Sequence, residues 1–265
     1  MIPDAVRALA EDPAAYEREP APASGFERLL SDRYCVLLGP VPSFTSVMRV
    51  RLQPEEIEET VAEVRRIVSE RRHVEPVWWI GGSATPRDLV DRLLALGFRP
   101  NEEPGWEPRC TAMALVEPPP AANGIFARRV GSLAEFRAAD EISGSAFGAP
   151  EEDQAELRAI DEQRFAAERR GEAPATYLAW ADGKPVASAR ALFTDAGVLL
   201  IGGGTLPEAR GRGAYRALVR ARWDDAVAAG TPALVVRAGA MSKPILERLG
   251  FQSVTDIDVL VDAAA

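Results

Sequence analysis

Four consecutive residues, Arg210 to Gly213, combine two arginines with two glycines in an acidic chain. They follow an apolar, strand-like run at 198–201 and precede a segment with helical spacing. A strand that ends in a glycine-bearing turn before a helix exposes the unpaired N–H groups of the helix N-terminus, which bind phosphate. Glycine lets an anion approach the backbone, and arginine adds charge-assisted hydrogen bonds. Two arginines at this place oppose the helix dipole unless an anion is bound, so an anion site is favoured over a solvated turn.

Two common phosphate motifs do not fit this junction. No Gly-Lys-Ser/Thr occurs in the chain, which excludes a Walker motif. The dinucleotide fingerprint begins at Gly211 and Gly213 but has Arg216 in its last position. No acidic residue ends the next apolar run, 233–239, to hold a ribose hydroxyl. A nicotinamide-dependent enzyme is therefore a distant alternative.

The composition limits the class of protein. The chain has 265 residues and a net charge of −9, which argues against nucleic acid or a membrane surface as a partner, since both are anionic. The two cysteines, Cys35 and Cys110, indicate a reducing compartment. No run approaches the ~20 apolar residues that span a bilayer, and the start of the chain lacks a signal-peptide pattern. We expect a soluble, cytoplasmic protein, and with His73 as the only histidine we expect no histidine-based triad and no metal.

The first half of the chain alternates strand-like and helical patterns. Two β-rich runs at 33–52 precede a helix at 57–68 and a strand at 74–82. Thr85 is expected to be the N-cap of the next helix, with Pro86 in its first turn and Gly97 ending it. A strand at 110–116 closes this half. Trp78 and Trp79 are interpreted as core residues, with an aromatic platform as the alternative.

The second half begins with a strand at 126–130 and a helix that the Ser132–Glu135 capping box opens. One charged helix is expected at 150–170. Its acidic residues are interpreted as a solvated helix face, with attraction of a cationic amine substrate as the alternative. Asp182-Gly183 predicts a hairpin. A helix from 214 is expected to bury the face that carries Leu218, Val219, Trp223, Ala226 and Val227. The other elements expected in this half are a strand at 197–205, a strand at 233–239, a short helix at 242–251 and a strand at 254–262.

The stretch "EPPPAANG" at 117–124 predicts a linker. We therefore expect an N-terminal domain at 1–118, a linker at 119–124 and a second domain at 125–265. Both halves share the order strand, helix, strand, helix ending in Gly-Phe, strand, with "DRLLALGF" at 91–98 matching "ILERLGF" at 245–251. A degenerate internal duplication explains this order, and only the second copy has the glycine- and arginine-rich junction.

The order of elements at 125–262, with an R-x-x-G-x-G/A loop at its centre, resembles the GNAT (GCN5-related N-acetyltransferase) superfamily. Residues 30–116 resemble a worn copy of the later part of that fold. The resemblance implies an α/β (α+β) fold with a mixed central sheet flanked by helices, in a tandem arrangement. It further implies acetyl-CoA as co-substrate and an N-acetyltransferase activity on an amine of a small molecule or side chain. A non-catalytic acyl-CoA-binding or interaction protein of the same fold is the alternative.

Carried onto this sequence, the family's motif assigns two groups of binding residues. The pyrophosphate would lie on Arg210, Gly211, Arg212, Gly213, Ala214 and Tyr215, and the pantetheine arm would face Thr205 and Leu206.

The sequence departs from the family at several places. Tyr215 stands where glycine or alanine is usual, and we interpret it as an aromatic that covers the helix start. Leu246 stands where a tyrosine often acts as general acid, so Ser242 or water would protonate the departing thiolate, or it would leave unprotonated. Glu208 and Asp195 are weak candidates for the general base, because acids are common in caps and turns.

Overall fold

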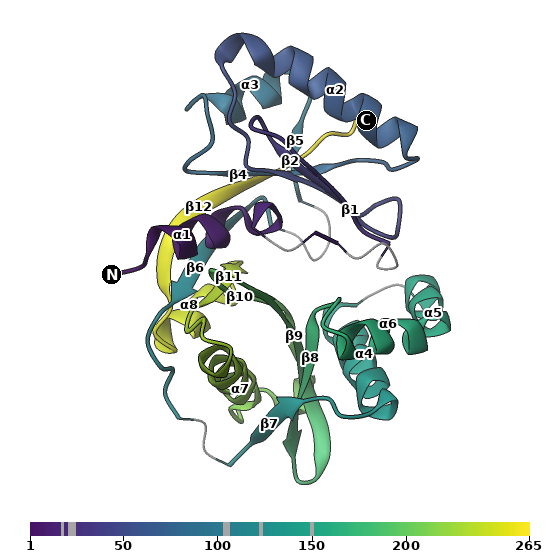
Figure 1. Cartoon of the computed structure of the whole chain (residues 1–265), viewed down its shortest axis with the longest axis vertical. Helices are drawn as coiled ribbons and strands as arrows, with labels where there is room; N and C mark the ends of the chain where they lie inside the picture. Colours follow the sequence, from purple (N-terminus) through teal and green to yellow (C-terminus); the bar gives the residue numbers. More distant parts are fainter. Residues whose placement is uncertain (17–18, 21–24, 103–106, 122–123, 149–150) are drawn as a thin grey trace. The chain divides into compact units, whose positions relative to one another are not determined.

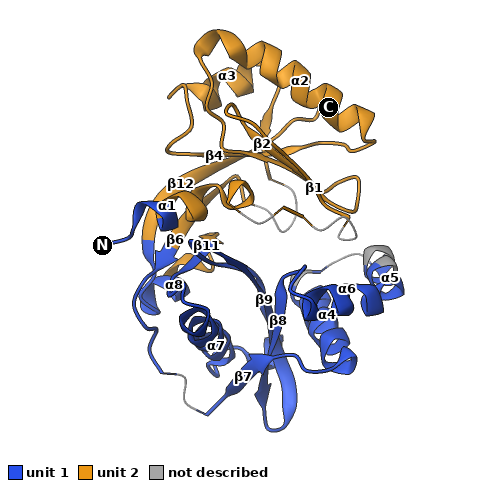
Figure 2. Cartoon of the chain, viewed as in Figure 1, with its two compact units in different colours: residues 1–6, 114–236, 245–252 blue, residues 7–113, 237–244, 253–265 orange. Residues whose placement is uncertain are grey.

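The computed structural model describes residues 1–265 except 17–18, 21–24, 103–106, 122–123 and 149–150. The chain forms two compact units (Figure 2): unit 1 is 1–6, 114–236 and 245–252, and unit 2 is 7–113, 237–244 and 253–265. Unit 1 includes residues 1–6 of the first half of the chain, and unit 2 includes residues 237–244 and 253–265 of the second half. The division into domains at 119–124 stays a prediction. The described residues of 119–124 form no helix or strand, and 122–123 lie outside the described residues.

Strands and helices alternate in both units (Figure 1). Unit 2 contains β1 (Glu27–Leu30), β2 (Cys35–Leu38), β3 (Thr45–Met48), α2 (Ile57–Glu70), β4 (Val77–Gly81), α3 (Leu89–Ala95) and β5 (Arg99–Pro100). Unit 1 contains β7 (Phe126–Arg129), α4 (Leu133–Phe147), α5 (Glu151–Ala159), α6 (Asp161–Arg169), β8 (Ala175–Ala181), β9 (Lys184–Thr194), β10 (Gly197–Thr205) and α7 (Ala214–Ala228). Elements with residues of both units are α1 (Asp4–Glu11), β6 (Arg109–Leu115), β11 (Leu234–Ala238), α8 (Lys243–Arg248) and β12 (Gln252–Val261).

The last strand of the chain completes the sheet of unit 2. β1, β2 and β3 pair antiparallel, and β3 pairs parallel with β4. β12 then pairs antiparallel with β4, from Ile257 opposite Gly81 to Val261 opposite Val77, and also with β5. Residues 253–265 therefore fold with the first half of the sequence rather than with the segment that precedes them.

Alternation along the strands of unit 2 gives its sheet two apolar faces. Val36, Val47 and Trp78 belong to a large core with the buried faces of α2 and α3. Their neighbours Cys35 and Met48 belong to a small cluster on the other side of the strands, where Trp79 packs as well. Both tryptophans are thus core residues of unit 2, as the sequence predicted.

The sheet of unit 1 is an antiparallel meander of β7, β8, β9 and β10, to which β11 adds in parallel. Asp182 and Gly183 form the predicted hairpin turn, both at positive φ of 52° and 75°. α7 lies on one side of these strands, and α4 and α6 lie on the other (Figure 1). Phe136, Ala139 and Ile142 of α4 pack with Leu178 of β8 in a buried cluster.

The predicted duplication is visible in the local geometry of the two Gly-Phe pairs. Gly97 and Gly250 have φ of 91° and 96°, and each ends a short helix. The N–H of Phe98 donates to the carbonyl of Leu93 and that of Phe251 donates to the carbonyl of Leu246, both at 3.1 Å. This 6→1 bond is that of a Schellman cap, which requires a residue with φ above zero.

Three sequence predictions are wrong in detail. Thr85 is not an N-cap: it pairs with Arg51 as a parallel bridge, and α3 begins only at Leu89. The charged helix at 150–170 is two helices separated at Ile160, and Pro150 lies outside the described residues. The break lets Asp161 point inward, where it is 2% exposed and binds Arg137 and Arg164. Val227 is 51% exposed, unlike the other apolar residues named for its helix.

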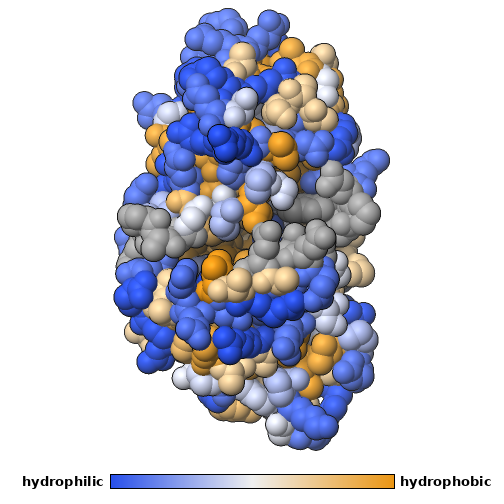
Figure 3. Space-filling view, turned by 90° about the vertical axis from the view of Figure 1, so that its right-hand side faces the viewer, coloured by the Kyte–Doolittle hydropathy of each residue, from blue (hydrophilic) through white to orange (hydrophobic). Residues whose placement is uncertain are grey.

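The surface follows the ordinary distribution of residues. The face in Figure 3 is mostly hydrophilic, with smaller hydrophobic areas between the charged side chains. None of the helices in the described part of the chain is both long and apolar enough to cross a membrane.

We expect the Arg65–Asp262 pair to be essential for the stability of unit 2. Both guanidinium nitrogens Nε and Nη2 donate to Asp262 at 2.8 Å, and the Asp262 side chain is fully buried. Asp262→Ala should lower the free energy of unfolding by about 2–4 kcal/mol, because it leaves a partly buried charge unpaired. The control is Asp258→Ala, which breaks a more exposed pair with Arg109 and should cost under about 1 kcal/mol. Equal losses in urea denaturation would contradict the assignment.

Candidate functional site

The parallel pairing of β10 with β11 is short. Val198 is opposite Leu234 and Leu199 is opposite Val235, and the register ends there. β10 continues to Thr205 in pairing with β9, with an irregularity between Ile201 and Gly204. The later residues of β10 therefore have one edge that β11 does not cover, just before the chain turns into α7.

The glycine-bearing turn that the sequence predicts before α7 is present. Gly211 and Gly213 have φ of 76° and 92°, and a Cβ atom at either place would meet no atom within 4 Å. Glycine is needed here for its conformation and leaves open space above the backbone. Because Ala217 donates to Gly213 as an early bond of the helix, the N–H groups of residues 214–216 have no partner within α7. α7 has 15 residues, so a developed dipole stands behind these donors.

The arginines of the turn hold positive charge beside these donors. Arg210 is exposed and its Nε donates to the Thr205 carbonyl at 3.4 Å. Arg212 donates from Nη2 to Asp182 of the β8–β9 hairpin at 2.7 Å, and both side chains are exposed. Asp182 thus partly neutralises the positive charge of the two arginines. The hydrogen bond from Arg212 lowers the pKa of Asp182. Solvent screening keeps this exposed pair easy to exchange for another anion.

Thr205 and Leu206 differ in what their backbone offers. The Leu206 N–H donates to the Val186 carbonyl of β9 at 3.0 Å, and the Leu206 side chain packs against the cluster of α4 and β8. Since successive N–H groups of a strand point to opposite edges, the Thr205 N–H points to the edge away from β9. Of the two residues named from the sequence, Thr205 therefore offers its backbone to a ligand there, whereas the N–H of Leu206 is occupied.

Tyr215 lies against the bare backbone of β10. A Cβ atom at Gly203 would be 2.6 Å from the Cε2 atom of Tyr215, so this glycine makes room for the ring. Burial raises the pKa of Tyr215, while the nearby guanidinium of Arg222 lowers it. Arg222 is 1% exposed and donates to the carbonyls of Leu218 and Arg190. The tyrosine that departs from the family motif thus joins β10 to α7, as the interpretation of a covering aromatic predicts.

The candidates for acid and base lie in different elements of the chain. Leu246 is fully buried in α8, in the same place as Leu93 in α3, so it is part of a core. Ser242 belongs to unit 2, where its hydroxyl donates to Gly239. Asp195 lies in the turn before β10, at the opposite end of this strand from Thr205. Glu208 is exposed in the turn after Thr205.

The corresponding junction of unit 2 is closed by backbone pairing. β3, α2 and β4 have the same order and the same parallel pairing as β10, α7 and β11. Beyond β3, however, the Thr85 N–H donates to Val50 and the Leu52 N–H donates to Thr85, both at 3.2 Å. The chain therefore pairs again where β10 and β11 do not.

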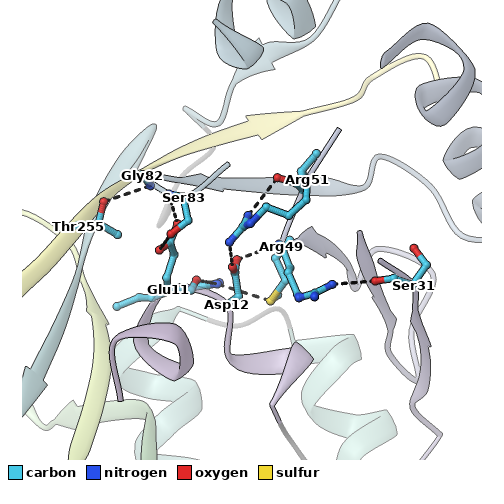
Figure 4. Close-up of polar contacts among 11 residues, drawn as sticks. Glu11, Asp12, Ser31, Arg49, Arg51, Gly82, Ser83 and Thr255 are labelled. Carbon is cyan, nitrogen blue, oxygen red and sulfur yellow. Dashed lines mark hydrogen bonds and ion pairs between the residues drawn. The ribbon is translucent and has the colours of Figure 1, made fainter. Parts of the chain in front are cut away.

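Two carboxylates of the N-terminal segment bind the remaining donors of that junction (Figure 4). Asp12 accepts from the Arg49 N–H at 2.8 Å and from Arg51 at 3.0 Å. Glu11 accepts from the N–H and the hydroxyl of Ser83 at 2.7 and 2.6 Å. Burial raises the pKa of Asp12, against the lowering by Arg51. The two carboxylates thus bind donors just beyond the ends of β3 and β4, within unit 2 itself.

Sequence reasoning missed these carboxylates and also a polar group in unit 1. Asp140 of α4 accepts from Arg164 of α6 and from Arg190 of β9. Ser188 of β9 is 2% exposed, and its hydroxyl has no hydrogen-bond partner in the described structure. Ser188 and Arg190 alternate on one face of a strand, which is the only trace of this group in the sequence. His73, the single histidine of the chain, is partly buried and hydrogen-bonded to Thr45 at 2.9 Å.

The fold is that of known acetyltransferases. No protein-family model and no curated protein matches this sequence. The chain is similar to a GCN5-related N-acetyltransferase from Kribbella flavida, with a TM-score of 0.71, 19% identity and 99% and 96% of the two chains covered. It is similar to a tandem GNAT protein from the clavulanic acid biosynthesis pathway, with a TM-score of 0.61, 15% identity and 88% and 78% covered. A Sphaerobacter thermophilus GCN5-related N-acetyltransferase has a TM-score of 0.60 at 18% identity, with 99% and 96% covered.

The chain therefore has the GNAT fold, a mixed sheet flanked by helices, and its neighbours include a tandem GNAT protein, which confirms the resemblance that the motifs carried.

We expect the Gly203–Tyr215 contact to be specific. Gly203→Ala should cost about 1–3 kcal/mol of folding free energy, because the new methyl group meets the tyrosine ring. In a Tyr215→Ser background the same substitution should cost much less, since the ring is gone. Urea denaturation of the two single variants and the double variant measures this coupling. An unchanged cost of Gly203→Ala in the Tyr215→Ser background would refute the contact.

Proposed function

We propose that the protein is an acetyl-CoA-dependent N-acyltransferase that transfers an acetyl group to an amine of a small molecule or side chain. The observation that carries the proposal is the turn from Arg210 to Gly213, with two glycines at positive φ, exposed arginines and the free N–H groups of α7. These are the features of an anion cradle. The GNAT fold supports the kind of anion, a CoA pyrophosphate.

Each binding residue has a proposed role. The backbone of Gly211, Gly213 and the first turn of α7, Ala214 and Tyr215, donates to the pyrophosphate, and Arg210 and Arg212 add charge. Thr205 offers its N–H at the open edge of β10, where it would bind the pantetheine arm or polarise the thioester carbonyl. Leu206 has a supporting role through its packing. When bound, acetyl-CoA supplies an activated acetyl group, and the acceptor must reach it as a neutral amine.

The proposal includes where the protein works. We place the activity in the domain that includes residues 125–252 and in the cytoplasm. Neither Cys35 nor Cys110 is part of a disulfide bond, which fits a reducing compartment. The net charge of −9 disfavours nucleic acids and membrane surfaces as partners.

A second function, binding of acyl-CoA without turnover, has one observation in its favour. Leu246 is fully buried where relatives of this fold often place a tyrosine acid, so unit 1 does not offer that proton donor. The two functions share the cofactor site and differ in the release of CoA.

Binding should depend on Gly213 in particular. Gly213→Trp should abolish the thermal stabilisation of the protein by acetyl-CoA, because the side chain fills the space above the N-terminus of α7. Gly230→Trp is the matched control: Gly230 lies just past the other end of α7, with φ of 79° and equally open surroundings. It carries the same backbone strain and should leave the stabilisation unchanged. A similar loss in both variants would reject the cradle.

Turnover should appear as free CoA thiol when acetyl-CoA is mixed with a panel of amines. The protein itself adds little to this signal, because burial raises the pKa of Cys110 to about 11 and Cys35 is 0% exposed. Thiol release supports the enzyme. Tight binding of acetyl-CoA with no release of CoA thiol across the panel would contradict the enzymatic function and favour binding without turnover.

One molecule of acetyl-CoA should bind per chain. The junction of unit 2 is paired with its own backbone and with Glu11 and Asp12, so it has no open cradle of the kind found in unit 1. Isothermal titration calorimetry measures the stoichiometry, and two sites of similar affinity would contradict this interpretation of unit 2.

A further inference from the structure

A hollow of about 340 Å³ in unit 1 lies beside α4, α5, α6 and β9, on the side of the strands away from α7. Its volume is in the range of small-molecule sites. The described lining residues are Arg137, Asp140, Glu141, Ser143, Gly144, Gln154, Leu157, Arg158, Asp161, Arg164 and Arg190. Nothing in the proposed cofactor site uses these residues.

The most buried polar residues of the hollow form a chain of alternating charges. Asp140 accepts from Arg164 at 2.5 Å and from Arg190. Asp161 accepts from the same Nη1 atom of Arg164 at 3.2 Å and from Nε of Arg137 at 3.2 Å. Three guanidiniums thus surround two carboxylates, and Asp161 is only 2% exposed.

The donors of this chain exceed its acceptors. Both carboxylates accept from two arginines each, whereas among the described residues Arg190 donates through Nη2 alone and Arg164 through Nη1 alone. A guanidinium has five N–H donors in a planar fork that matches a carboxylate. Of the other charged residues in the described lining, Glu141 is exposed to solvent, and Arg158 has its own partner in Glu151. These N–H groups, unused among the described residues, can bind an added anion.

A small void shares lining residues with this hollow and with β10. It has a volume of about 10 Å³ and is lined by Ser143 and Arg190, which also line the hollow, together with Ser188 and Gly202. Gly202 lies in the irregular stretch of β10, and Arg190 is opposite its neighbour Ile201. The Ser188 hydroxyl faces this void without a hydrogen-bond partner in the described structure. A polar group that is buried and unpaired indicates a missing partner.

We propose that the acceptor is a small amine that also carries a carboxylate, in the manner of an amino acid. The proposal rests on the proposed acetyl transfer. Arg137, Arg164 and Arg190 bind the carboxylate, and the Ser188 hydroxyl hydrogen-bonds the amine on its way to β10. The amine nitrogen forms a bond to the acetyl carbon, the C–S bond breaks with its electron pair leaving on the CoA thiolate, and the amine proton passes to the thiolate or to water.

Matched substrates test the class of acceptor. Each standard amino acid is compared with its amide, which removes the carboxylate charge and leaves the amine. CoA release should be at least about tenfold more efficient with some amino acid than with its amide, the worth of a charge-assisted hydrogen bond. Amides or plain alkylamines that match or exceed every amino acid would overturn the proposal.

Two variants test the assigned residues. Arg137→Gln should raise KM for the preferred amino acid about tenfold and leave KM for acetyl-CoA unchanged. Arg128→Gln is the control, because Arg128 on β7 is 44% exposed, close to the 49% of Arg137, and pairs with Glu135 outside the hollow. Ser188→Ala should keep the melting temperature, since the hydroxyl makes no hydrogen bond within the described residues, and should lower kcat/KM for the amino acid about fivefold. Normal kcat/KM in both Arg137→Gln and Ser188→Ala would overturn the assignment.

A binding measurement keeps this inference separate from the proposed function. Glutarate, a dicarboxylate without an amine, is titrated into the protein without acetyl-CoA. Thermal stabilisation of the wild-type chain that is lost in Arg137→Gln supports the carboxylate site even if no acetyl-CoA binds. No stabilisation by glutarate would overturn the site even if acetyl-CoA binds and turns over.

Discussion

The early end of the pairing between β10 and β11 is the constraint on which unit 1 depends. Two parallel strands satisfy each other's backbone groups only while they stay adjacent, and here the register ends at Leu199 and Val235. The rest of β10 keeps one paired edge, to β9, and presents the other to whatever lies beside it. Three features lie along that stretch: the contact of Gly203 with Tyr215, the hydrogen bond from Arg210 to the Thr205 carbonyl, and the turn into α7.

Unit 2 shows what the same architecture does without that opening. Its two parallel strands meet again at Arg51 and Thr85, and buried carboxylates bind the backbone that is left. Burying Glu11 and Asp12 is costly unless each charge is fully hydrogen-bonded, and the contacts of both carboxylates in Figure 4 provide such bonds. In unit 2 the ends of the two strands are thus satisfied by groups of the same chain.

Local sequence signals predicted the elements well. Ser132 is the predicted N-cap of α4, although Glu135 accepts from the N–H of Gly131 rather than from that of Ser132. The Asp182-Gly183 hairpin and the two Gly-Phe helix ends each depend on a residue with positive φ. The glycine- and arginine-rich turn belongs to the same class, so its backbone conformation was predictable before any fold was known. What the sequence could not predict depends on residues far apart in the chain. Nothing near Ile160 breaks a helix, and Asp161 turns inward only because Arg137 and Arg164 are there to receive it. The unpaired hydroxyl of Ser188 is likewise a property of its surroundings, and a serine in a strand gives no hint of it.

The interleaved order of the two units has a consequence for the synthesis of this chain. Residues 253–265 complete the sheet of unit 2, although most of that unit leaves the ribosome first. The strand β4 therefore keeps one edge unpaired until β12 has been made, and an unpaired edge is where chains aggregate. Unit 1 in turn includes residues 1–6, so neither half can finish alone. Cleavage at the proline-rich stretch would yield two incomplete fragments rather than two domains.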